Sequence, residues 1–208
     1  PPLGKVTVSS PLRMSDKSIE NFVRLNIAWI KTQQEKFKNQ PRMTERQYVS
    51  GETYYIFGKQ FFLEFIPSAK RFFKIDGNKI LLGMKESSTA EHRKKFARKE
   101  FRKILTEQLE RIIPKWEEKT GFYCDSFKTK YMTTRWGTCN PKVKRIWINL
   151  QMVEKPLECI EYVVLHELVH LKVRNHGNDF KAMMNKFMPD WKNRKNILNK
   201  LIIDSYVE

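Results

Sequence analysis

The residues of this chain that are best suited to chemistry lie in one short segment, in which His166, Glu167 and His170 form an H-E-x-x-H pattern and His176 follows six residues later. Two histidines four residues apart on a helix project from the same face, so both imidazoles can bind one metal ion. The glutamate lies beside that metal, where it can take a proton from a water molecule. The sequence therefore predicts a metal site formed by the three histidines, with Glu167 as the catalytic base.

The other residues of the chain favour a catalytic metal over a structural one. A structural zinc site normally completes its coordination shell with cysteines, whereas three protein ligands leave a fourth position for water or substrate. The three cysteines, Cys124, Cys139 and Cys159, include no C-x-x-C pair, so we expect free thiols in a reducing cytoplasm rather than a zinc ribbon or a disulfide framework. Three imidazoles also suit Ni²⁺ or Co²⁺, but affinity order and availability make Zn²⁺ the expected cofactor. The alternative to a metal site is a helix that carries two histidines by chance.

Length and charge limit the classes of function. The 208 residues are enough for one large domain or two small ones with an apolar core. No run of about 18 or more apolar residues is present, and the first residues have neither the charged nor the apolar region of a secretory signal. No membrane partner is therefore predicted, and a cytoplasmic location is expected. The net charge of +17 suits phosphate backbones, anionic surfaces or acidic protein partners.

One predicted helix concentrates part of this positive charge. Six basic residues would fall largely on one flank of it: Lys94, Lys95, Arg98, Lys99, Arg102 and Lys103. Such a stripe is consistent with a nucleic-acid partner. A solvated lysine-rich face is the alternative, and no zinc finger or other sequence-reading module accompanies the stripe.

The order of the predicted elements indicates an α+β fold in two parts. The first part, residues 1–86, is expected to be β-rich with one helix. Its predicted elements are a strand at 6–9, an amphipathic helix that Ser15 opens, and two hairpins with turns at 58–59 and 76–78.

The second part, residues 87–208, is predicted to carry the metal site. A capping box at Ser88–Glu91 opens a long helix, which Gly121 ends. Pro156 begins the helix that contains the metal motif, and the break at Asn175–Gly177 would return His176 toward the metal. The remaining predicted elements are strands near 127–133 and 145–150 and helices near 178–187 and 190–203.

Several of these motifs together resemble the YgjP-like metallopeptidases, which belong with the SprT-like, minimal gluzincin-type zinc peptidases. The resemblance is carried by R-W-G-T-C at Arg135–Cys139, I-N-L at Ile148–Leu150, Pro156, the segment Glu161–Leu171 with its H-E-L-V-H motif, N-H-x-x-x-F at Asn175–Phe180, and Pro189–Trp191. Segments at 5–11, 29–30 and 55–59 also look like the family's N-terminal part. This combination is more specific than the H-E-x-x-H pattern alone.

The resemblance implies a zincin core, with a long helix, a short twisted sheet, the active-site helix and a helical tail. It implies Zn²⁺ bound by the same three histidines, Glu167 as the general base, and a peptide or protein substrate. Thr138 stands where serine is commoner in the family, which keeps the hydroxyl group. Family members usually begin with one or two more strands before the segment that matches Lys5–Ser10, so a trimmed N-terminus is expected here.

Three functions remain open at this point. The leading prediction is a zinc-dependent peptidase of the cytoplasm. The second is a DNA-associated, SprT-like protease that acts on DNA-bound proteins, which the net charge favours. The third is a non-catalytic binding or regulatory module that keeps its metal for stability, and the intact Glu167 argues against it. In a peptidase, the strand at 145–150 or the strand before Trp136 is expected to present an edge to the substrate.

Other residues near the motif have roles that the sequence leaves open. Trp136 is predicted either to line the substrate cleft or to anchor its turn in the core. Tyr162 and Arg174 are candidates to stabilise the oxyanion of the reaction. Glu161 and Asp179 are candidates to orient the histidines.

Overall fold

The computed structural model describes residues 6–38 and 46–200, and the described chain forms two compact units. The first unit contains α1 (Asp16–Leu25) and α2 (Ile27–Lys38). The second contains all the described residues from 46 onward. The predicted boundary at residue 86 lies inside this second unit, and a separate domain of residues 87–208 stays a prediction.

The first unit has two consecutive helices where the sequence predicts one. Ser15 caps α1 as expected, because its Oγ accepts a hydrogen bond from the amide of Ser18 at 3.4 Å. Asn26 separates the two helices, and its Nδ2 donates a hydrogen bond to the carbonyl of Phe22 at 2.8 Å. Asparagine side chains bond readily to nearby backbone groups, which explains why the helix ends there.

Two expectations for this unit are wrong. Residues 6–9 were expected to form a strand, but they have no regular secondary structure, since no other described residues of the unit offer a strand to pair with. Residue 5, at the start of the matching segment, lies outside the described residues. The polar segment 31–38 was not expected to be helical, yet α2 continues through it, because lysine, glutamine and glutamate are good helix formers.

The second unit begins with a four-stranded sheet in the order β1-β2-β4-β3. Both predicted hairpins are confirmed, with the first turn at residues 57–58 instead of 58–59, and β2 and β4 pair in parallel between them. At the first turn, Phe57 and Gly58 both have positive φ values, of 50° and 80°, as a type I′ turn requires. The bounds are β1 (Thr53–Ile56), β2 (Lys59–Pro67), β3 (Phe72–Asp76) and β4 (Lys79–Met84).

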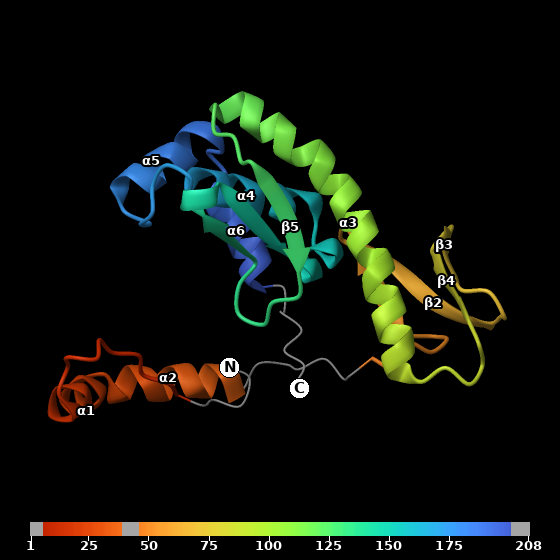
Figure 1. The fold of residues 1–208 in the computed structure, drawn as a ribbon, viewed down its shortest axis with the longest axis horizontal. Helices are drawn as coiled ribbons and strands as arrows, with labels where there is room; N and C mark the ends of the chain where they lie inside the picture. Colours follow the sequence, from red (N-terminus) through yellow and green to blue (C-terminus); the bar gives the residue numbers. More distant parts are fainter. Residues whose placement is uncertain (1–5, 39–45, 201–208) are drawn as a thin grey trace. The chain divides into compact units, whose positions relative to one another are not determined.

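The long helix α3 (Ala90–Thr120) connects this sheet to the rest of the unit (Figure 1). Thr89 caps its first turn by accepting a hydrogen bond from the amide of His92 at 3.3 Å, and Gly121 ends it with a φ of 71°. Phe101 packs against Tyr54 and Phe73 of the first sheet at centroid distances of 5.9 and 5.4 Å. The C-terminal half of α3 runs beside a second sheet (Figure 1).

The second sheet has the order β5-β7-β6, with bounds β5 (Ser126–Lys130), β6 (Gly137–Asn140) and β7 (Arg145–Asn149). The sequence predicted β5 and β7 but not β6. Because β7 pairs with β5 on one side and β6 on the other, it has no free edge. The expectation that residues 145–150 present an edge to a substrate is therefore wrong. The outer strands are β6 and β5, and a substrate edge on β5, the strand before Trp136, stays a prediction.

The metal motif lies in α4 (Leu157–Val169), which Pro156 precedes as predicted. Nine of its thirteen residues are buried, so α4 is a core helix. The final helices are α5 (Asn178–Phe187) and α6 (Trp191–Lys200), and the predicted extension of α6 from 201 to 203 lies outside the described residues. Short 3₁₀ turns occupy η1 (Pro141–Val143) and η2 (Leu150–Glu154). Within the described ranges, no helix is long and apolar enough to cross a bilayer.

Candidate metal centre

The three predicted histidines converge on one point. His166 lies in the last turn of α4, His170 directly follows the helix, and the turn before α5 brings back His176. The Nε2 atom of His170 is 3.1 Å from those of both His166 and His176, and the third pair is 3.0 Å apart. Among the described residues they form the one cluster of histidine, cysteine or acidic side chains close enough to hold a metal ion.

This donor set fits a metal ion such as zinc. Three nitrogens bound tetrahedrally to zinc at ~2.0–2.1 Å would be about 3.3 Å apart, which is close to the observed separations. Nδ1 of His170 is 2.9 Å from the carbonyl oxygen of Val173. A hydrogen bond donated by Nδ1 to this carbonyl leaves the lone pair on Nε2, which is the tautomer that a metal ligand needs.

The apolar ring of Phe180, on α5, packs against all three imidazoles. Its ring centroid is 4.8, 4.9 and 4.7 Å from those of His166, His170 and His176, and only 2% of its surface is exposed. Sequence reasoning used Phe180 as part of a motif but gave it no role. The position of Phe180, four residues after His176, is the feature of the sequence that could have indicated this contact.

Burial shifts the acid–base properties of His166. Desolvation, followed by the neighbouring charges of His170 and His176, lowers the pKa of His166 from 6.5 to about 3. Its Nδ1 atom is buried and has no hydrogen-bond partner among the described residues. The ring of Tyr162 packs against it edge-on at 5.7 Å. A neutral imidazole, as a metal ligand requires, is therefore the stable form.

Glu167 lies on α4 and is 4% exposed. Burial raises its pKa from 4.5 to about 8, and the positive charge of Arg135 partly opposes this shift. Gly137 of β6 lies against the carboxylate: a Cβ atom at that position would be 2.6 Å from Oε1 of Glu167. The close packing of β6 on α4 therefore depends on the glycine of the R-W-G segment.

The site opens into a cavity of about 560 Å³. The predicted residues His166, Glu167, His170, His176 and Trp136 all line it. Trp136 is also half-buried against the core, so it both faces the cavity and anchors its turn. The other lining residues are Arg135, Gly137, Thr138, Cys139, Pro141, Tyr162, Val163, Arg174, Lys195, Leu198 and Asn199.

Asn149 holds the loop that precedes β6, and sequence reasoning gave it no such role. Its Nδ2 donates hydrogen bonds to the carbonyls of Met132 and Arg135 at 2.7 and 2.8 Å. Its Oδ1 accepts from the amides of Met132 and Gln151 at 3.2 and 3.1 Å. Asn149 has no exposed surface. A fully bonded buried amide of this kind fixes the loop that carries Arg135 and Trp136.

The other candidates divide into two groups. Tyr162 and Arg174 both line the cavity, and burial raises the pKa of Tyr162 to about 12, which keeps its phenol protonated. Of the two carboxylate candidates, Glu161 pairs with an arginine instead of a histidine, and the role of Asp179 stays a prediction. Glu161 bonds to Arg194 at 2.7 Å, and Asp179 is exposed. The observed partner of a site histidine is instead the Val173 carbonyl, which a sequence motif of side chains cannot reveal.

Comparison with known proteins places this geometry in a family. The model of the YgjP-like metallopeptidase domain matches residues 1–201. No curated protein matches the chain significantly. Among solved structures, the metallopeptidase zymogen abylysin of Pyrococcus abyssi has 20% sequence identity and a TM-score of 0.41, covering 45% of this chain and 94% of that one. The metallopeptidase zymogen jannalysin of Methanocaldococcus jannaschii has 24% identity and a TM-score of 0.40, covering 45% and 97%.

The structural similarities are partial, so the assignment rests on the family match, which extends over almost the whole chain. The chain carries the α+β fold, the histidine cluster and the adjoining glutamate that the resemblance in its sequence implied. It therefore belongs to the YgjP-like family of metallopeptidases.

Proposed function

We propose that this peptidase uses a zinc ion held by His166, His170 and His176, with Glu167 as the general base. The observation that carries the proposal is the meeting of three Nε2 atoms within 3.1 Å of one another, beside a buried carboxylate in an open cavity. Zinc, when bound, supplies Lewis acidity and lowers the pKa of a water molecule at its open position to about 7.

Glu167 moves the proton in this mechanism. Its carboxylate takes a proton from the attacking water and delivers it to the amine that leaves, so one residue serves both steps. Burial, which raises its pKa to about 8, makes the carboxylate a stronger base, while a nearby cation would favour its ionised form. Gly137 keeps the β6 backbone close to the carboxylate and limits its movement.

The peptide substrate is proposed to lie along β6. This short strand is an outer strand of its sheet, and residues Gly137, Thr138 and Cys139 line the cavity. An extended peptide can pair with such an edge through backbone hydrogen bonds, which positions its scissile carbonyl without requiring a particular sequence. Tyr162 and Arg174 line the same cavity and are the proposed donors to the oxyanion.

Metal analysis and peptide cleavage test this proposal together. We expect about one equivalent of zinc in the native protein and loss of that zinc in a His170→Ala variant. Glu167→Gln should keep the metal but lose at least about a hundredfold in kcat/KM. His92→Ala is the matched control, because His92 is exposed at the start of α3. Full activity in the Glu167→Gln protein would contradict the base assignment, and full activity in the zinc-free His170→Ala protein would favour a non-catalytic role for the metal.

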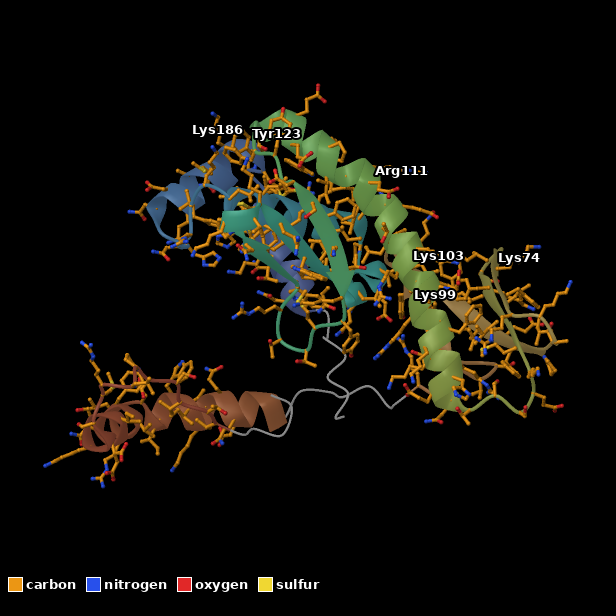
Figure 2. All side chains as sticks on the ribbon, viewed as in Figure 1. Lys74, Lys99, Lys103, Arg111, Tyr123 and Lys186 are labelled. Atoms are coloured by element: carbon orange, nitrogen blue, oxygen red, sulfur yellow. The ribbon has the colours of Figure 1, made fainter. Side chains whose placement is uncertain are left out.

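A second candidate function is proteolysis of DNA-bound proteins. Four residues of the predicted basic stripe on α3 are exposed: Lys95, Lys99, Arg102 and Lys103. Figure 2 shows Lys99 and Lys103 side by side on this helix, with Arg111 further along. A salt-dependent shift of duplex DNA that weakens in a Lys95→Gln/Lys99→Gln/Arg102→Gln variant would support this function. Equal binding by the native protein and the variant would exclude the stripe as the DNA site.

A further inference from the structure

The charges that line the cavity are unevenly distributed. Among the described residues that line it, Glu167 is the one acidic side chain, whereas Arg135, Arg174 and Lys195 are all cationic. All three cations are exposed, and none of them forms an ion pair with a residue that the structure describes. Their charges are therefore available to a molecule that enters the cavity.

The fold itself does not use these cations. Other arginines of this unit are paired with carboxylates: Arg194 bonds to Glu161 and Asp190 at 2.7 and 2.8 Å, and Arg46 bonds to Glu154 at 2.6 Å. Arg135, Arg174 and Lys195 have no comparable partner in the described ranges. Excess charge in a cavity between low-dielectric walls attracts a ligand of the opposite sign more strongly than the same charge on an open surface.

The cations approach the reacting centre from different elements. Arg135 comes from the loop before β6, and its charge acts on the carboxylate of Glu167. Lys195 comes from α6, and its charge acts on both His166 and His176. A peptide that lies along β6 would therefore pass close to cations contributed by two separate elements.

We infer that this site selects polypeptide segments in which acidic side chains flank the scissile bond, and that Arg135 and Lys195 determine this specificity. The inference rests on the proposed function and names its substrate class. A carboxylate side chain beside the bond would form a charge-assisted hydrogen bond with a guanidinium or ammonium group. The apolar lining from Trp136, Tyr162 and Leu198 suits the remaining side chains of a polypeptide.

The test uses the zinc-loaded full chain and an unbiased mixture of peptides, with the cleaved bonds identified by mass spectrometry. We expect aspartate and glutamate to be enriched in the few positions on either side of the cut. Matched synthetic peptides then differ only by glutamate or glutamine at the enriched positions. The glutamate peptide should have a kcat/KM about fivefold higher for each acidic residue at low salt, and high salt should reduce this ratio.

Three variants distinguish the effect of the cations in the cavity from the effect of the other basic residues on the surface. Arg135→Gln and Lys195→Gln should each bring the glutamate-to-glutamine ratio of kcat/KM toward one. The ratio is the readout because the charge of Arg135 also acts on Glu167 and that of Lys195 on the histidines, so the rate with either peptide alone changes as well. Lys74→Gln removes the same charge from β3, on the other sheet (Figure 2), and should leave the ratio unchanged. A ratio that falls equally in all three variants would show a general effect of net charge and would overturn the inference.

The remaining outcomes distinguish this inference from the proposed function. Cleavage without a preference for acidic residues overturns the inference alone. Failure to cleave any peptide, in a protein that contains zinc, overturns both. If a short single-stranded oligonucleotide inhibits cleavage, and Arg135→Gln removes this inhibition but not the peptide preference, the cations serve a nucleic acid and the inference is overturned.

Discussion

The backbone of Gly137 and the side chain of Glu167 are packed so closely that no larger residue fits between β6 and α4. A Cβ atom at position 137 would be 2.6 Å from Oε1 of Glu167, 2.8 Å from its Cγ and 2.9 Å from Cγ1 of Val163. The glycine thus sets how near the proposed substrate strand lies to the proposed base.

A Gly137→Ala variant should separate catalysis from metal binding. The added methyl group must displace the carboxylate, and a displacement of about 1 Å can reduce kcat/KM by about a hundredfold. Zinc content should remain near the native value, because residue 137 is not in the histidine cluster. Gly177→Ala is the matched control, since a Cβ atom there would have no neighbour within 4 Å. Native activity in Gly177→Ala and in Gly137→Ala alike would contradict this account.

The stability of the metal-free protein should fall in mild acid because of His166. Its pKa is about 3 in the folded chain and 6.5 ordinarily, so between these values the unfolded chain binds a proton that the folded chain does not. The contribution of this residue is fully present above about pH 6.5 and decreases by ~1.4 kcal/mol for each pH unit below it. Urea unfolding at pH 7.5 and pH 5.0 measures the change. His166→Asn should reduce the difference, whereas His92→Gln should preserve it, and an identical difference in His166→Asn would exclude His166 as the cause.

Asn149→Ala should damage both the fold and the activity. The substitution removes the partner of four hydrogen bonds, including those to the carbonyl of Arg135 and to the amides of Met132 and the buried Gln151, at a cost of about 2–3 kcal/mol in the free energy of unfolding. The loop that carries Trp136 would lose its position, so kcat/KM should fall while zinc is retained. Asn140→Ala, at the exposed end of β6 where the side chain caps η1, should cost less than about 1 kcal/mol. Thermal unfolding and metal analysis of both variants provide the comparison.

Cys139 should react slowly with alkylating agents in the folded, metal-free protein. Burial, followed by the charge of Glu167, raises the pKa of its thiol from 9.0 to about 11. At pH 8 the thiolate fraction falls from about one in ten to about one in a thousand, and alkylation needs the thiolate. In a Cys124→Ser/Cys159→Ser background, iodoacetamide should label Cys139 about a hundredfold more slowly before urea unfolding than after it. Rapid labelling of the folded chain would show that the thiol is activated.

Much of the fold was predictable wherever a local pattern determines local structure. The predicted capping box at Ser88–Glu91 placed the start of α3 within one residue, since Thr89 and not Ser88 caps the helix, and the left-handed Gly121 ends it as predicted. The turn at Gly58 specifies its hairpin in the same way. The strand predicted at 6–9 is absent because its pattern indicated a strand but not a partner.

The candidate site was predictable only as far as its side-chain pattern. The spacing of His166, His170 and His176 indicated that they converge, because helical geometry brings the first two together. The four-residue strand β6 has too little alternation to be recognised. The Val173 carbonyl and the contact between Gly137 and Glu167 arise from packing between segments distant in the sequence or from backbone atoms, which motifs do not report.

The contact between Phe180 and the three histidines couples metal binding to the local stability of α5. Phe180 belongs to α5 and touches all three imidazoles, so any ion that draws the rings together also fixes the surface on which α5 rests. Chelation should then loosen this helix before the rest of the domain, and the amides of α5 should exchange with deuterium earlier than those of α3. The exchange rate of the α5 amides should therefore report the fraction of the protein that has bound metal.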